Sequence, residues 1–173
     1  MTYAEMREIA ETGDVLLVRG NMLVRIFSAE SYSHVALLVW LDDGSGGLWV
    51  FEFVEGKGFQ AMPASQWFAG RSRQRIYYGT APEVVRFNGS VAKNLALSYR
   101  VKRPVRRVYG YLSLLVVWAS QVTGLRLPVW LRVCSTFVQE CWEATGYTGL
   151  KRTADPGDIA EVCQSLTPIT EEP

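Results

Sequence analysis

An apolar segment, a glycine-rich turn and a second apolar segment together restrict the fold more than any other feature of the sequence. Residues 35–41 are all apolar, and residues 48–54 contain one charged side chain, Glu52. The intervening residues 42–47 include two aspartates and three glycines, which is typical of a turn. The sequence therefore predicts a β-hairpin whose first strand, beginning at His34, is apolar on both faces.

The remaining pattern places strands early in the chain and helices late. Short apolar runs bounded by turn residues predict further strands at 15–18, 59–62, 75–78 and 84–87. Helical spacing predicts helices at 2–11, 91–101, 106–122 and 134–145, a helical turn at 63–68 and a short closing helix at 159–164. Strands followed by helices indicate an α+β fold.

The length of 173 residues suits one domain with a substantial core. We therefore expect a single domain over residues 1–173. Within it, residues 104–133 are rich in aromatic side chains and are expected to form a long helical insertion. Residues 167–173 are expected to be a loose tail.

The longest apolar stretch, residues 108–122, contains several polar side chains. It is shorter than the roughly 20 residues that a membrane-spanning helix needs, so we expect a buried helix. The first twelve residues are polar and acidic and do not resemble a secretion signal. The expected location is the cytoplasm, with release by lysis or by a dedicated secretion route left open.

The formal net charge of +1 gives no electrostatic argument for binding nucleic acid. Basic residues nevertheless cluster, because ten of the 18 Lys and Arg lie between residues 71 and 107 with one acid among them. This cluster fits either a solvated face or a surface that contacts anionic lipids or polymers. Such a contact, including one with a membrane, would involve Arg100, Lys102, Arg103, Arg106 and Arg107.

The three cysteines and one histidine do not match a metal site. Cys134, Cys141 and Cys163 have no CxxC spacing. On one helix, Cys134 and Cys141 would be about 10 Å apart, too far for a disulfide. We therefore expect reduced thiols, as in the cytoplasm, and no metal or cofactor.

Cys134 begins the helix predicted at 134–145, which Gly146 would end. Unpaired backbone N–H groups and the positive end of the helix dipole favour a thiolate there. Thiol catalysis requires a proton partner, and His34 is the only histidine. The sequence thus predicts a Cys134–His34 pair that forms an acyl-enzyme, with the oxyanion bound by backbone N–H groups. Tyr32 and Ser135 are candidates for further contact with the oxyanion or substrate.

A third polar group is needed to orient the imidazole. Glu52 lies in an otherwise apolar strand and therefore needs a polar partner. It lies opposite His34 if the hairpin turn is tight, and one step diagonal on the same face if the register shifts by two residues. A further shift by one residue would place Glu55 opposite His34, so Glu55 is the alternative third residue.

Each of these residues also has a structural interpretation. A lone cysteine in an apolar helix is commonly a small core residue, and a histidine that begins a strand is commonly a surface residue. An alternative function is therefore a binding or structural module without turnover.

Five segments occur in an order that matches a known family. A Gly-Asp pair precedes an apolar strand at 13–18, Tyr-Ser-His-Val begins the segment 32–39, and Val-Phe-Glu occupies 50–52. Val-Cys-Ser-Thr-Phe-Val follows at 133–138 and Asp-Pro-Gly-Asp-Ile-Ala at 155–160. This set, with histidine before cysteine, resembles the circularly permuted NlpC-type papain-like hydrolases, in particular their lecithin–retinol acyltransferase-like branch.

The resemblance implies a small antiparallel sheet or half-barrel packed against helices, with Cys134, His34 and Glu52 as catalytic triad. Relatives include amidases or peptidases that act on cell-wall peptides. Others are acyltransferases or phospholipases of the lecithin–retinol acyltransferase kind. We therefore expect a cysteine hydrolase that cleaves an amide in a peptide-like substrate. The alternative enzyme is a lipid acyl hydrolase or acyltransferase at a membrane surface.

Overall fold

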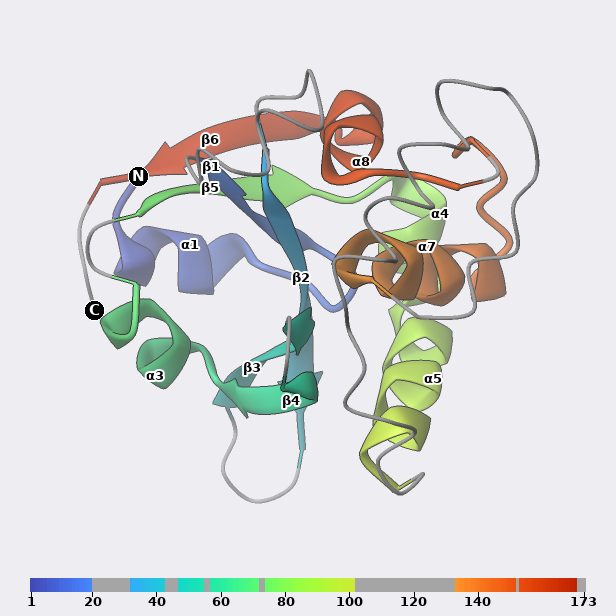
Figure 1. The fold of residues 1–173 in the computed structure, drawn as a ribbon, viewed down its shortest axis with the longest axis horizontal. Helices are drawn as coiled ribbons and strands as arrows, with labels where there is room; N and C mark the ends of the chain where they lie inside the picture. Colours follow the sequence, from blue (N-terminus) through green and yellow to red (C-terminus); the bar gives the residue numbers. More distant parts are fainter. Residues whose placement is uncertain are drawn as a thin grey trace.

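The structure is a computed structural model that describes residues 1–19, 32–42, 47–54, 57–71, 74–101, 133–151 and 153–170. This part of the chain forms one sheet with helices on both faces (Figure 1). The strands are β1 (Val15–Arg19), β2 (His34–Leu41), β3 (Gly47–Val54), β4 (Gly58–Pro63), β5 (Arg75–Thr80) and β6 (Ser165–Ile169). The helices are α1 (Tyr3–Ile9), α3 (Ala64–Ala69), α4 (Glu83–Phe87), α5 (Gly89–Val101), α7 (Cys134–Ala144) and α8 (Pro156–Val162).

The strands lie in the order β4-β3-β2-β1-β5-β6, and all neighbours are antiparallel. The predicted hairpin is β2 and β3. Its register pairs Leu41 with Gly47, so the chain passes five residues before it pairs again. This longer turn gives the shifted register rather than the direct one, and Glu52 lies one step diagonal from His34 on the same face.

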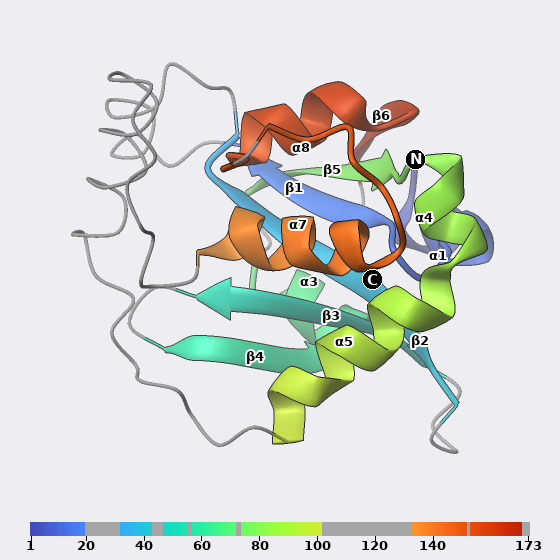
Figure 2. The same ribbon diagram turned by 90° about the vertical axis from the view of Figure 1, so that its right-hand side faces the viewer.

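Side-chain alternation along the strands divides the core into two layers. Leu37 of β2 belongs to the cluster that contains Trp142 of α7. Leu38, the next residue, belongs to the cluster that contains Met6 of α1 and Trp67 of α3. Figures 1 and 2 show α1 and α3 on one face of the sheet and α5, α7 and α8 on the other. Both faces of β2 are therefore covered, which explains its continuous apolar sequence.

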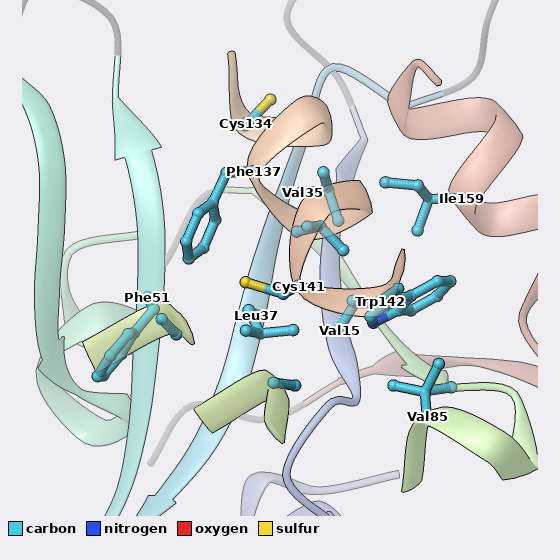
Figure 3. Close-up of a cluster of buried hydrophobic side chains, with 14 of the residues drawn as sticks. Val15, Val35, Leu37, Phe51, Val85, Cys134, Phe137, Cys141, Trp142 and Ile159 are labelled. Atoms are coloured by element: carbon cyan, nitrogen blue, oxygen red, sulfur yellow. The ribbon is translucent and has the colours of Figure 1, made fainter. Parts of the chain in front are cut away.

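Contacts of its buried face and of its C-terminal end fix the position of α7. Phe137 and Trp142 are fully buried against the sheet (Figure 3). The indole N–H of Trp142 donates to the carbonyl oxygen of Gly13 at 2.9 Å. The chain leaves the helix through Gly146 with a φ of +93°, a conformation that favours glycine. These contacts determine where Cys134, at the other end of the helix, lies.

Asp14, the residue before β1, is a buried acceptor for several groups. Its carboxylate accepts from the backbone N–H of Glu11 at 2.8 Å, from that of Ala81 at 2.9 Å and from the Tyr78 hydroxyl at 2.5 Å. The Nε of Arg86 lies 3.4 Å away. Burial raises the pKa of Asp14, although the hydrogen bonds and the Arg86 charge act against it. This cluster joins β1 and β5 to the segments beside α1 and α4.

Two predicted elements were wrong. Residues 84–87, predicted as a strand, form α4, because Pro82 and Glu83 suit the start of a helix and only Val85 is buried. Residues 167–169, predicted as part of a loose tail, belong to β6 and pair with β5.

The α+β fold class, an antiparallel sheet packed against helices, is confirmed. The predicted helix at 106–122 lies outside the described residues, as does the predicted insertion except for Val133. The single-domain organisation stays a prediction. Within the described ranges, no helix is both long and apolar enough to span a membrane.

Candidate active site

His34 and Glu52 are joined by a short contact between neighbouring strands. The imidazole Nε2 of His34 lies 2.6 Å from Oε2 of Glu52. The Glu52 side chain is 1% exposed and that of His34 is 18% exposed. A carboxylate at this distance accepts the Nε2 proton and thereby determines the orientation of the ring.

The same carboxylate also binds Arg71, which follows α3. Nη2 of Arg71 lies 3.0 Å from Oε1 and 3.1 Å from Oε2 of Glu52. The guanidinium carbon lies 4.1 Å from the centre of the Trp67 ring, which is a cation–π distance. Glu52 is therefore bound by an imidazole on one oxygen and by a guanidinium on both.

These partners keep Glu52 ionised despite its burial. Burial by itself would raise the pKa of Glu52, but the hydrogen bond and charge of His34 and the charge of Arg71 outweigh it and lower the pKa. The indole N–H of Trp67 acts in the same direction, although it makes no hydrogen bond of ordinary geometry. Glu52 is thus a carboxylate at neutral pH.

Cys134 is the first residue of α7, as the sequence predicts, and is 4% exposed. No side chain caps this helix, since Val133 at the N-cap has no acceptor and the hydroxyl of Thr136 bonds back to the backbone of Val133. The N–H groups of a first helical turn favour negative charge on the sulfur. Figure 3 shows Cys134 at this end of the helix and Cys141 further along it, within the core.

The thiol of Cys134 interacts with the ring of His34. Burial by itself would lower the pKa of His34, but the charge of Cys134 and hydrogen bonds with Cys134 and Glu52 raise it to about 9. Because Nε2 is bound to Glu52, the ring nitrogen available to contact the Cys134 sulfur is Nδ1. The arrangement favours an imidazolium between a thiolate and a carboxylate.

These residues come from different layers of the fold. By alternation, His34 lies on the same face as Ala36 and Leu38, which belong to the layer of α1 and α3. Cys134 belongs to the cluster on the opposite face. They meet because β2 and α7 both begin at the same end of the sheet (Figure 2). The site therefore lies at the sheet end rather than over one face.

The single histidine allows a direct test of this charge state. We expect the His34 ring to titrate with a midpoint of about 9, so that the imidazolium persists to higher pH than in an ordinary histidine. In Cys134→Ala the midpoint is expected to fall, because burial remains while the negative sulfur is lost. NMR titration of the ring Cε1–H measures both values. An unchanged midpoint in the variant would contradict a charged sulfur beside the ring.

Tyr32 and Ser135, the other two predicted contact residues, lie close in sequence to His34 and Cys134. Tyr32, two residues before His34, packs edge-on against Tyr77 with ring centres 5.5 Å apart. Ser135 follows the nucleophile candidate and is 2% exposed. Contact of Tyr32 or Ser135 with an oxyanion or substrate stays a prediction.

Glu55 and most of the predicted anion-binding set lie outside the described residues. Arg100 is the member of that set that the structure does describe. Its guanidinium carbon lies 5.1 Å from the centre of the Trp49 ring. Contact of this segment with an anionic surface stays a prediction.

Arg71 is the site residue that the sequence does not single out, since it belongs to a broad basic cluster. Two signals point to it. A glutamate in an apolar strand needs a donor or cation, and Arg71 lies four residues after Trp67, hence on the same side of a helical turn. Neither signal places α3 against β3, as the structure does.

No family model and no curated protein matches the sequence. Among solved structures, one that is similar is metalloprotein YiiX from Escherichia coli O157:H7, described as DUF1105. The match covers 94% of this chain and 97% of YiiX, with a TM-score of 0.57 and 15% identity. The fold resembles that of YiiX. At this identity the likeness concerns the fold alone, and membership of the permuted papain-like, NlpC-type family stays a prediction. Assignment to the lecithin–retinol acyltransferase-like branch stays a prediction.

The description of YiiX as a metalloprotein applies to that protein. In the described part of this chain, no group of three or more His, Cys, Asp or Glu residues is placed to hold a metal ion. Both oxygens of Glu52 are bound to Arg71, and one also to His34. A metal ion at this carboxylate would have to displace the guanidinium, so these residues do not fit one.

Proposed function

We propose that the chain is a cysteine hydrolase that cleaves an amide bond in a peptide-like substrate through an acyl-cysteine. Cys134 is the nucleophile, His34 its proton partner and Glu52 the group that orients the imidazole. The proposal is supported chiefly by the His34 ring lying between the sulfur of Cys134 and a buried carboxylate. A nucleophile, a base and an orienting group in consecutive contact are what acyl transfer requires.

In acylation, the Cys134 thiolate attacks the carbonyl carbon and forms a C–S bond, while the carbonyl electron pair moves to oxygen. Backbone N–H groups in the first turn of α7, which no side chain caps, stabilise this oxyanion. The imidazolium of His34 donates its Nδ1 proton to the leaving nitrogen, and the C–N bond breaks. The products are an amine, an acyl-cysteine and a neutral imidazole.

In deacylation, the neutral imidazole takes a proton from water as the water oxygen attacks the acyl carbon. The C–S bond then breaks, which releases a carboxylic acid and restores the thiolate and the imidazolium. Glu52 accepts the Nε2–H of His34 throughout and so keeps Nδ1 directed toward the reacting atoms. The hydrolysis of one amide bond thus consumes one water molecule.

Selective alkylation tests the nucleophile. At pH 7 and with limiting iodoacetamide, Cys134 is expected to react about 10-fold or more faster than Cys141 and Cys163, because only it is held as a thiolate. Burial raises the pKa of Cys163 to about 12, so that this thiol stays protonated. His34→Ala is expected to remove the preference. Equal, slow labelling of all three cysteines in the wild type would support a module without turnover.

Reporter substrates test the reaction itself. A p-nitroanilide and a p-nitrophenyl ester of one acyl group are expected to give the same acyl-Cys134 adduct in intact-mass spectra, with both turned over. Turnover of the ester alone would contradict amidase activity.

For the proposed anionic contact involving Arg100, co-sedimentation with anionic liposomes at low salt and its loss at high salt would place the substrate at a lipid surface instead.

A further inference from the structure

Arg71 is the remaining charged group at the site, and the proposed reaction does not use it. Its guanidinium bonds both oxygens of Glu52, at 3.0 and 3.1 Å. The orienting carboxylate of a thiol or serine hydrolase acts through its negative charge and its position. A cation on that carboxylate changes both properties, so the effect of Arg71 should reach His34.

We propose that Arg71 is a positioning residue that fixes the Glu52 carboxylate against His34 and offsets its charge, so that the imidazolium can release its proton to the leaving group. The catalytic consequence rests on the proposed hydrolase function. The effect on the ring does not.

The guanidinium is itself held in place. It stacks on Trp67, which is fully buried, with 4.1 Å between the guanidinium carbon and the ring centre. The backbone N–H of Arg71 donates to the carbonyl of Phe68 at 2.8 Å, which continues the last turn of α3. The Arg71 side chain is 19% exposed. Stacking on Trp67 orients the planar guanidinium so that Nη2 is directed at both oxygens of Glu52, and a lysine ammonium has no planar group to be oriented in this way.

The charges at the site balance only when Arg71 is counted. A thiolate at Cys134 and a carboxylate at Glu52 contribute two negative charges, whereas the imidazolium of His34 contributes one positive charge. Arg71 supplies the second. Without it, the site would carry a net negative charge that binds the imidazolium proton more tightly. A more tightly held proton makes a weaker general acid toward the leaving nitrogen.

The charged groups that act on His34 and Glu52 reach them from two other elements. Cys134 reaches the ring from α7 and Arg71 reaches the carboxylate from the turn after α3. On β4, the residue paired with Glu52 is Gln60, which is uncharged. Removal of Arg71 therefore changes the local charge by one unit, with no compensating group among these residues.

Titration of the single histidine tests the electrostatic part. In Arg71→Met and Arg71→Gln, the NMR midpoint of the His34 ring is expected to rise by about one pH unit, because the carboxylate bonded to the ring loses its neutralising cation. Arg71→Lys keeps the charge and should shift the midpoint much less. Arg7→Met is the matched control, because Arg7 also lies over a tryptophan ring, that of Trp40, which is six residues from His34 along β2. It should leave the midpoint unchanged.

Kinetics test the positional part. With the p-nitroanilide, kcat of Arg71→Met is expected to fall about 10- to 100-fold while KM changes little, as for other groups that orient a catalytic residue. The alkaline limb of the profile of kcat against pH should move to higher pH, together with the His34 midpoint. Arg71→Lys should recover the position of the limb but not the full kcat.

A His34 midpoint within 0.2 pH unit of wild type in a folded Arg71→Met or Arg71→Gln would overturn the proposal and leave Arg71 a structural residue. Circular dichroism identifies folded variants. If Arg71→Met does not fold, Arg71→Gln against Arg71→Lys gives the same comparison, because both retain donors for Glu52 and differ in charge. A wild type that turns over neither reporter would refute the hydrolase, while the titration would still decide the role of Arg71.

Discussion

Cys134→Ala is expected to lower kcat for the p-nitroanilide reporter by on the order of 10⁴-fold or more. Alanine cannot form the acyl intermediate, so only residual stabilisation by backbone N–H groups would remain. Stopped-flow and long-incubation assays together cover this range. Intact-mass spectra should show no acyl adduct on the variant.

Cys141→Ala is the matched control, since Cys141 lies on the same helix and is fully buried in the core. It removes the same atom and is expected to keep kcat within a factor of about two while losing roughly 1 kcal/mol of stability. Comparable loss of activity in both variants would show that α7 tolerates no truncation and would contradict a specific role for Cys134. Normal activity in Cys134→Ala would refute the nucleophile.

Asp14→Ala is expected to cause the largest loss of stability, about 3–5 kcal/mol. The substitution removes the acceptor of two backbone N–H groups and of the Tyr78 hydroxyl, all at a site with no solvent exposure. It also leaves Arg86 without this carboxylate. For a chain of this size the melting temperature should fall by on the order of 10 °C. Thermal and urea unfolding measure the change.

Asp14→Asn removes the charge and keeps one of the two acceptor oxygens. Burial raises the pKa of Asp14, so the environment disfavours the charged form, and the acceptor geometry is what stabilises the fold. The neutral asparagine is therefore expected to cost less than alanine. Tyr78→Phe, which removes one donor from the same cluster, should cost about 1 kcal/mol. A larger loss for asparagine than for alanine would contradict this account.

The parts of the fold that could be predicted are those whose local sequence and tertiary environment agree. The apolar run from residue 35 to 41 suits only a covered strand, and Gly146 marks the end of α7 because the backbone there needs a positive φ. Residues 84–87 show the opposite case. Their β-branched side chains favour a strand, but Pro82 and the contacts of Arg86 with Glu11 and Asp14 stabilise a helix.

The candidate site was predicted as a set of residue types, and its geometry was not. Cys134, His34 and Glu52 stand out because each is chemically unusual for its segment. Their relative placement depends on the length of the turn before Gly47 and on where α7 docks, which are tertiary properties. Arg71 could not be predicted as a site residue, since its contact with Glu52 forms only when α3 packs against β3.

The meeting of two layers at one imidazole has a consequence during synthesis. His34 and Glu52 emerge from the ribosome early, and Cys134 follows about eighty residues after Glu52. On the proposed mechanism, neither half of the protein is catalytic by itself, because a nascent or partly opened chain has only the ordinary reactivity of exposed thiols. Turnover of the p-nitroanilide should therefore appear only when α7 has docked on the sheet, and would serve as a reporter of complete folding.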